Sequence, residues 1–384
     1  MKSQHLYWLL SLFATAFGAG VLYVPVDATG GTPLLIIAVA LLAACIIAVG
    51  HIFFASMSLS QSQPRRIGDI VEQQMGTTWR VIFAWVFFLA TFTILLVYSI
   101  GIHSEYANSL YQLFGWSRRP GGLAYWISIF APLVFIGLSL LDTDKTIRVI
   151  SSFIFILLVA IVFVTFYLWF FIEPITPTGP ISQPVDISAL TFASGFLPLM
   201  IFGMNFSPII PRFGQKYQNH TKPAVIIIIA TCLLLVTVIC AFILACHYAL
   251  PDSVLHYLKT QPGLSNASIL TLLETAYQND LILHFLTPFI SMLVLTGAFI
   301  GTFIGAQEAT ENVCHTFMPN KAKSTIQRIA LYSMIIIIYG VIFSPFQIKS
   351  IISDITSPAI LTLIFIIPAV YWFKIKQRQR LKTE

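Results

Sequence analysis

Ten apolar runs constrain this chain more than any other feature, because each is about as long as a helix that crosses a lipid bilayer. Such a helix needs about 20 residues to span about 30 Å of hydrocarbon. Charged residues make up only 9% of the chain, against about 25% in soluble domains, so a soluble globular fold is excluded. The sequence predicts an all-α polytopic membrane protein with a single transmembrane domain over 1–384. The runs cover residues 6–26, 34–57, 80–104, 123–141, 147–172, 189–211, 223–250, 281–306, 327–344 and 351–373.

Lysine and arginine gather in alternate loops, and this distribution predicts the orientation of the chain. With the N-terminus in the cytoplasm, only four of the 21 Lys and Arg face outside, namely Arg118, Arg119, Lys259 and Lys349. Because cytoplasmic loops are enriched in these residues, both termini are expected in the cytoplasm, the C-terminus as a basic tail over 374–384. The net charge of +6 then reflects topology, and no nucleic-acid partner is expected.

Two of the runs contain residues that oppose a continuous helix. Gly18 and Gly20 stand at the middle of the first run, where each costs roughly 1 kcal/mol relative to alanine. The sixth run contains Gly203, Asn205 and Pro208, and proline lacks a backbone donor. Backbone groups freed in hydrocarbon need partners, which a bound solute can supply. We therefore predict ten transmembrane helices, of which the first and the sixth are broken.

The interrupted runs occupy matching places in the two halves of the chain. Each half, residues 6–172 and 189–373, contains five predicted spans, and an odd number makes the halves run in opposite senses across the membrane. Interrupted segments at corresponding positions are typical of inverted-repeat transporters with a midplane site. The sequence therefore predicts a five-plus-five inverted repeat and a carrier that works by alternating access.

Five strings resemble the bacterial hydroxy/aromatic amino acid permease family, a part of the amino acid–polyamine–organocation superfamily. They are SLFATAFGAGVLYVPVDA, LLVYSIGI, FGMNFSPII, TGAFIGTFIGAQEATEN and SPAILTLIFIIPAVYWF, and those after the first resemble the serine/threonine permease branch. The resemblance implies a leucine-transporter-type fold in the bacterial inner membrane. It also implies proton-coupled symport of L-serine and L-threonine into the cell.

The carboxylate of an amino acid substrate needs hydrogen-bond donors. The amides of Gly18, Ala19 and Gly20 begin the second half of the broken first helix, and the positive end of a helix binds anions. By resemblance, Tyr98 in the third run lies against the same carboxylate; an interfacial or packing tyrosine is the alternative. These four residues are the predicted carboxylate site.

The ammonium and the side chain of the substrate need acceptors. The carbonyls of Ala14 and Phe202 lie at the opened helix ends, and the Asn205 side chain adds a further acceptor. Ser207 is expected to receive the substrate hydroxyl, although serine before proline also bonds backbone in kinked helices. Gly203 stands where the family often has serine, which leaves the side-chain preference open.

Coupling to an ion gradient has three candidate residues. The superfamily places a cation site between the broken first helix and the eighth, which here implies the carbonyl region of Phe17 and the side chain of Thr296. His51 has an ordinary pKa suited to a proton relay, with a structural histidine as the alternative. The other ionisable residues in or beside the runs are Asp27, Glu105, Glu308 and Asp354. Asp27 and Glu105 are expected as solvated groups near the outer ends. Glu308 is expected to pair with Lys or Arg.

Other functions stay open as alternatives. Within the transporter class these are an aromatic substrate, tryptophan or tyrosine, and coupling to sodium instead of protons. A non-transporting amino acid sensor is a distant alternative, and an enzyme is not expected because clustered acid–base or metal ligands are missing from the sequence. No cofactor or metal is expected, and the partners are a small amino acid, a coupling proton and the lipid bilayer.

Overall fold

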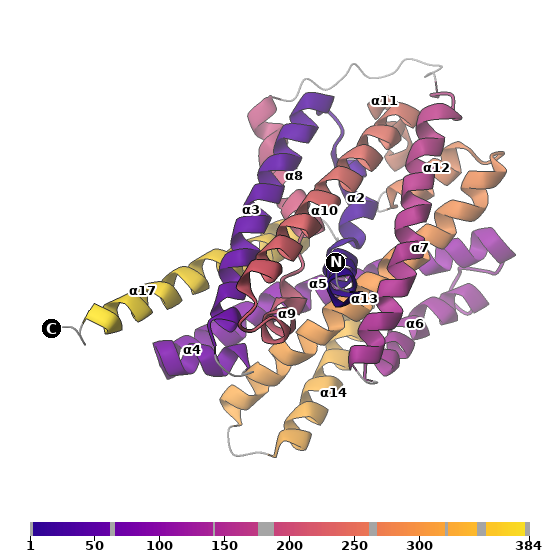
Figure 1. Cartoon of the computed structure of the whole chain (residues 1–384). Helices are drawn as coiled ribbons and strands as arrows, with labels where there is room; N and C mark the ends of the chain where they lie inside the picture. Colours follow the sequence, from indigo (N-terminus) through magenta and orange to yellow (C-terminus); the bar gives the residue numbers. More distant parts are fainter. Residues whose placement is uncertain are drawn as a thin grey trace.

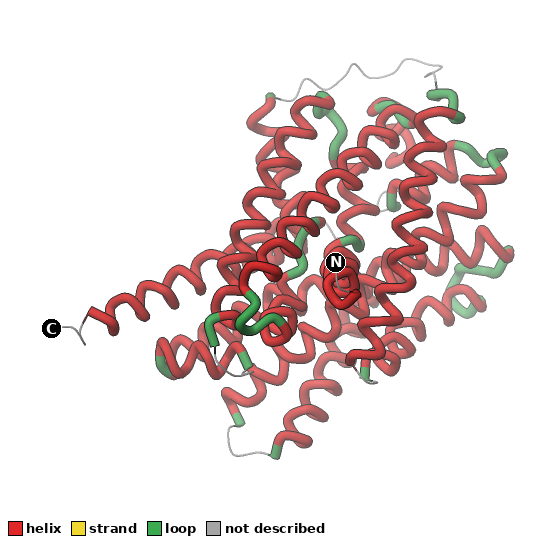
Figure 2. The backbone as a smooth tube through the Cα atoms, viewed as in Figure 1, coloured by secondary structure: helices red, strands yellow, loops and turns green. Residues whose placement is uncertain are grey.

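The computed structural model describes residues 3–61, 66–140, 143–175, 188–260, 267–318, 322–343 and 351–380. Within these ranges the protein is built of helices and contains no strand (Figure 2). The elements, labelled as in Figure 1, are α1 (Ser3–Ala16), α2 (Ala19–Asp27), α3 (Pro33–Leu59), α4 (Ile67–Met75), α5 (Thr77–Phe114), α6 (Leu123–Ser139), α7 (Thr143–Phe170), α8 (Ala189–Gly203), η1 (Ser207–Ile209), α9 (Ile210–Lys216), α10 (Thr221–Ala249), α11 (Asp252–Thr260), α12 (Ile269–Ala276), α13 (Leu281–Phe317), α14 (Lys323–Ile342), η2 (Ile351–Thr356), α16 (Ser357–Leu361), η3 (Thr362–Ile366) and α17 (Ile367–Arg380).

The apolar runs form the membrane-spanning helices of the protein. Among the described residues, eight helical segments are long and apolar enough to cross a membrane, and the bent pair of α1 and α2 raises the number to nine. The helix α6 is also apolar but has only 17 residues. The all-α polytopic prediction is therefore confirmed, while the count of ten spans stays a prediction.

Both predicted helix breaks are present. The axes of α1 and α2 differ by 50°, and Phe17 and Gly18 between them are not helical. In the sixth run, α8 ends at Gly203, and η1 and α9 resume the helix after residues 204–206. Glycine at the first break and proline after the second explain the local departure from helix.

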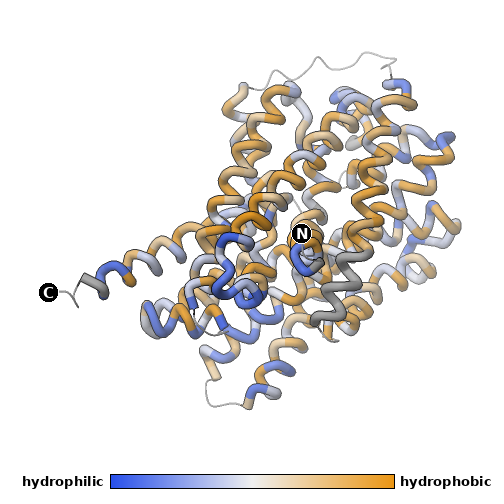
Figure 3. The backbone as a smooth tube through the Cα atoms, viewed as in Figure 1, coloured by the Kyte–Doolittle hydropathy of each residue, from blue (hydrophilic) through white to orange (hydrophobic). Residues whose placement is uncertain are grey.

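The long helices α5 and α13 pack against each other along the centre of the molecule (Figure 1). The first broken helix lies beside α13, α7 and α10, and α3 lies beside α8, α9 and α10. Large apolar side chains of α6, α7 and α14 face outward, as lipid-facing residues do. Figure 3 shows apolar residues along most of the bundle and hydrophilic residues around α4 and α9 and at the helix ends.

Several boundaries differ from those the sequence predicts. The helices α5 and α13 continue to Phe114 and Phe317, about three turns beyond the apolar runs, because the polar residues that follow still pack against neighbouring elements. The first part of the basic tail, up to Arg380, continues the helix α17. Its Lys, Arg and Gln residues favour helix.

Candidate functional site

The two helix breaks touch each other through glycine. A Cβ atom added to Gly20 would overlap the backbone Cα of Gly203, and one added to Gly203 would lie 3.4 Å from the Gly20 Cα. The backbones of the first and sixth spans therefore meet with no side chain between them. A larger residue at position 20 would hold the two breaks apart, whereas a Cβ at position 203 would make an ordinary van der Waals contact.

The first break offers only part of the predicted set of amide donors. The amide of Gly18 donates to the Ala16 carbonyl at 2.8 Å, so it is already engaged within the break. Ala19 and Gly20 begin α2, and the first amides of a helix have no acceptor within that helix. The Ala14 carbonyl belongs to the last turn of α1, beside this group of donors.

Tyr98 of α5 reaches both breaks. Its hydroxyl donates to the Thr15 carbonyl at 3.4 Å, and a Cβ on Gly18 would lie 2.6 Å from its Oη. Its ring centroid lies 6.2 Å from that of Phe202. The side chain is 1% exposed, so Tyr98 lies inside the bundle and not at the lipid interface.

The second break contains polar atoms that the protein does not satisfy. The Oδ1 of Asn205 accepts a hydrogen bond from the Ser207 amide at 3.2 Å, which orients the side-chain amide. The Nδ2 of Asn205 and the Oγ of Ser207 are buried and have no hydrogen-bond partner among the described residues. Buried polar groups are nearly always paired, so these two atoms are candidates for contact with a substrate. The alternative bond from the Ser207 hydroxyl to backbone is not present.

Of the coupling candidates, Phe17 stacks on Phe13 with centroids 4.6 Å apart, inside the first break. Thr296, which was expected beside Phe17, makes its hydrogen bonds elsewhere. Its hydroxyl donates to the Met292 carbonyl at 2.7 Å and pairs with Tyr106 of α5. The threonine hydroxyl therefore faces α5.

Other residues of α13 face the first break. A Cβ on Gly18 would meet Ala298, and one on Gly301 would lie 2.6 Å from the Thr15 Oγ1. Thr302 follows directly, is fully buried, and its Oγ1 has no hydrogen-bond partner in the described ranges. Sequence reasoning missed Thr302, although its position four residues after Ala298 places both on one helix face.

His51 of α3 lies against the second break. Its ring stacks on Phe206 with centroids 4.0 Å apart and planes 11° apart. The residue is fully buried. The structure thus brings this candidate to the break of the sixth span.

Glu105 is not the solvated group that the sequence predicts. Its carboxylate is 1% exposed and accepts hydrogen bonds from Ser268 Oγ at 2.8 Å, Thr271 Oγ1 at 2.9 Å and the Ser268 amide at 3.3 Å. These donors lie at the start of α12, which follows α5 by more than 150 residues. The prediction is wrong because a local sequence does not reveal which distant helix covers a side chain.

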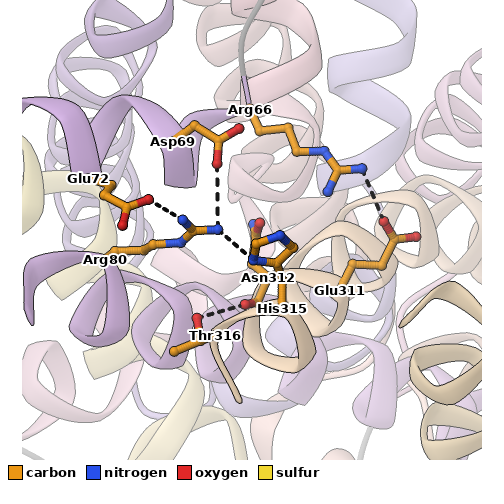
Figure 4. A network of polar contacts seen from close by, with 8 residues as sticks. All are labelled: Arg66, Asp69, Glu72, Arg80, Glu311, Asn312, His315 and Thr316. Carbon is orange, nitrogen blue, oxygen red and sulfur yellow. Dashed lines mark hydrogen bonds and ion pairs between the residues drawn. The ribbon is translucent and has the colours of Figure 1, made fainter. Parts of the chain in front are cut away.

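Ion pairs join α4 and α9 to the C-terminal end of α13. Arg66 lies 3.6 Å from Glu311, and Arg212 lies 3.8 Å from Glu308 (Figure 4 for the first pair). Around Arg80, Figure 4 also shows contacts with Asp69, Glu72 and His315. The expected pairing of Glu308 with a basic residue is confirmed.

The comparisons with known proteins agree with this geometry. The sequence profile of the tryptophan/tyrosine permease family matches residues 3–383. The serine transporter SdaC of Escherichia coli K12 is 25% identical over 379 residues, which cover 94% of this chain and 85% of the relative. The threonine/serine transporter TdcC of Escherichia fergusonii is 24% identical over 410 residues, which cover 96% of this chain and 89% of the relative.

The fold also matches a solved structure. The manganese transporter of Eremococcus coleocola, in complex with an aromatic bis-isothiourea substituted compound, has a TM-score of 0.55 to this chain at 14% identity. The match covers 96% of this chain and 76% of that chain. Similarity at this level shows a shared fold, and it confirms the predicted leucine-transporter-type architecture.

Proposed function

We propose that this chain, which belongs to the tryptophan/tyrosine permease family, is a secondary active transporter that carries L-serine and L-threonine into the cell. The observation that supports this most is the pair of helix breaks that meet at Gly20 and Gly203, next to the unpaired side chains of Asn205 and Ser207. The similarity to relatives named as serine and threonine/serine transporters supports the substrate class.

In this proposal the substrate carboxylate binds at the start of α2. The amides of Ala19 and Gly20 donate to it, and Tyr98, which packs directly against Gly18, lies beside it. Because Gly18 donates to Ala16, its own amide contributes only if that bond opens.

The other end of the substrate binds at the second break. The carbonyls of Ala14 and Phe202 receive the ammonium. Asn205, expected as a further acceptor, already accepts a hydrogen bond from the Ser207 amide through its Oδ1, so the group it leaves free for the substrate is the Nδ2 donor. The Ser207 hydroxyl, buried and unpaired, bonds the hydroxyl of serine or threonine. The close approach of the Gly20 and Gly203 backbones leaves little space at this point, which favours a substrate with a short side chain.

Coupling in this proposal uses the proton gradient. One charge that moves through 100 mV releases about 2.3 kcal/mol. That energy supports a concentration ratio of about fiftyfold. The ion-coupling candidates remain Phe17, Thr296 and His51, to which the geometry adds Thr302. Sodium coupling is the alternative, and no cofactor takes part.

The proposed function also implies a location for the protein in the cell. It is a multi-pass membrane protein. We infer that it lies in the bacterial inner membrane with both termini in the cytoplasm, surrounded by lipid. The bundle of spans one, two, six and seven moves against the rest around the site, as in alternating access.

An aromatic substrate is the second candidate function, because the family description names tryptophan and tyrosine. The close approach of Gly20 and Gly203 opposes a large side chain at this point.

The test is uptake of labelled L-serine into proteoliposomes, first with a proton gradient and then with a sodium gradient. We expect proton-driven uptake that threonine inhibits and tryptophan does not. Asn205→Ala is expected to weaken serine binding by about tenfold, or about 1.4 kcal/mol. Ser333→Ala is the matched control, because Ser333 bonds backbone within α14. Inhibition by tryptophan alone would favour the aromatic substrate, and no uptake in either gradient would reject the function.

A further inference from the structure

His51 is a buried histidine with one ring nitrogen in use. Its Nδ1 lies 2.8 Å from the Ile47 carbonyl. A carbonyl only accepts hydrogen bonds, so Nδ1 carries the hydrogen, and in the neutral ring Nε2 keeps a free lone pair. This Nε2 is buried and has no hydrogen-bond partner among the described residues.

The polar surroundings of the ring come from one neighbouring element. Helices α4, α8, α9, α10 and α17 and the segment η3 pack against α3. Among the described residues, none of them brings a charged or titratable side chain into interaction with the ring; its polar neighbours are the Ile47 carbonyl and the Asn205 side chain. His51 and Asn205 interact electrostatically, without a hydrogen bond of ordinary geometry. The ring therefore interacts with a polar residue of the break in the sixth span.

The Asn205 amide is held in one orientation. Its Oδ1 accepts from the Ser207 amide at 3.2 Å, so its Nδ2 is the atom left unpaired. His51 and Asn205 thus each have one unpaired polar atom at the break of the sixth span.

We propose, resting on the transport function above, that His51 is the proton-binding residue of the carrier and that the Asn205 amide transmits its charge state to the substrate site. A proton from bulk water adds to the Nε2 lone pair and makes the ring a cation with two N–H donors. This new donor opposes the Nδ2 donors of Asn205. The amide then turns its Oδ1 to the ring and releases the Ser207 amide.

Proton and substrate become linked through this rotation. The Asn205 amide and the freed Ser207 amide both belong to the break where the substrate ammonium and hydroxyl are expected. In the state open to the cytoplasm the proton leaves Nε2, and the amide returns to Ser207. The stacking of His51 on Phe206 carries the same change to the backbone of the break.

The experiment compares wild type and His51→Gln in proteoliposomes, with two readouts. Exchange of labelled for unlabelled serine needs no net proton movement, whereas accumulation against a gradient does. We expect H51Q to keep exchange within about twofold and to lose proton-driven accumulation. Serine affinity in the wild type should change by about tenfold per pH unit over the titration range, and H51Q should show no such dependence. The twofold limit on the exchange by H51Q corresponds to about 0.4 kcal/mol.

His103→Gln is the control. His103 lies on α5, away from the breaks, and bonds Ser128 at 3.0 Å; the variant should accumulate serine as wild type does. Accumulation by H51Q equal to wild type would overturn the inference and leave the transport function intact. Loss of exchange as well, in a folded H51Q, would also overturn it, because the ring would then be structural.

A second measurement needs no variant. Serine binding to the wild type in weakly buffered solution should take up protons, as followed with a pH indicator dye. Serine binding between pH 5 and 8 without proton uptake would overturn the inference. Failure of the wild type to exchange serine at all would reject the transport function itself, so the two failures are distinguishable.

Discussion

At the scale of single residues, Gly20 and Gly203 set the distance between the two broken helices. A side chain on Gly20 would collide with the backbone of Gly203, and backbone cannot move aside as a flexible side chain can. The unpaired atoms of Asn205 and Ser207 lie directly after this contact. The site geometry therefore depends on a close approach that two glycines permit.

The variant Gly20→Ala tests this dependence. Its methyl group would push the first and sixth spans apart, so serine affinity in the purified protein should fall by at least about tenfold, or about 1.4 kcal/mol. The variant Gly195→Ala is the matched control, since no atom lies within 4 Å of a Cβ at that helical position. Equal binding by Gly20→Ala and Gly195→Ala would contradict the assigned contact.

At the scale of elements, the short helix α12 is held in place by a side chain from another part of the chain. It contacts α2 and α13, and its residues from Ile269 to Glu274 are buried. Glu105 of α5 accepts three hydrogen bonds at its N-terminus, where a carboxylate also interacts favourably with the helix dipole. The carboxylate therefore fastens α12 over the second half of the broken first helix.

Removal of this carboxylate should loosen α12. In Glu105→Ala the hydroxyls of Ser268 and Thr271 lose their acceptor, and each buried donor left unpaired costs about 1–3 kcal/mol. We expect a lower melting temperature in detergent and faster proteolysis between α11 and α12. Glu173→Ala, at an exposed side chain, is the control. Unchanged melting and cleavage in Glu105→Ala would refute the fastening role.

At the scale of the whole molecule, charge distribution orients the protein in the membrane. The helix α4, with ion-paired arginines around it, packs against α17, and Arg378 of α17 donates to the Gln73 carbonyl of α4 (Figure 1). Basic residues are retained on the cytoplasmic side during insertion. Both termini are therefore expected to face the cytoplasm.

Reporter fusions test the orientation. Green fluorescent protein fused after the last residue should fluoresce, and alkaline phosphatase at the same place should be inactive. Phosphatase inserted in the loop after α5, near Arg118, should be active because that loop is expected outside. The reverse result at both sites would show that the orientation is inverted.

The sequence by itself determined the spans and the breaks. Apolar run length and the conformational effects of Gly18, Gly20 and Pro208 are local properties, so the bilayer and the backbone fix them without knowledge of distant contacts. The resemblance of five short strings to a permease family added the expected fold and the expected substrate class.

Only the tertiary structure decided which side chains meet. Thr296 of α13 bonds Tyr106 of α5, whereas Ala298 and Gly301 of the same helix pack against the first break. Glu105 is buried by α12, and His51 rests on Phe206. Such contacts join residues far apart in the chain, and the packing angles and rotations of whole helices set them.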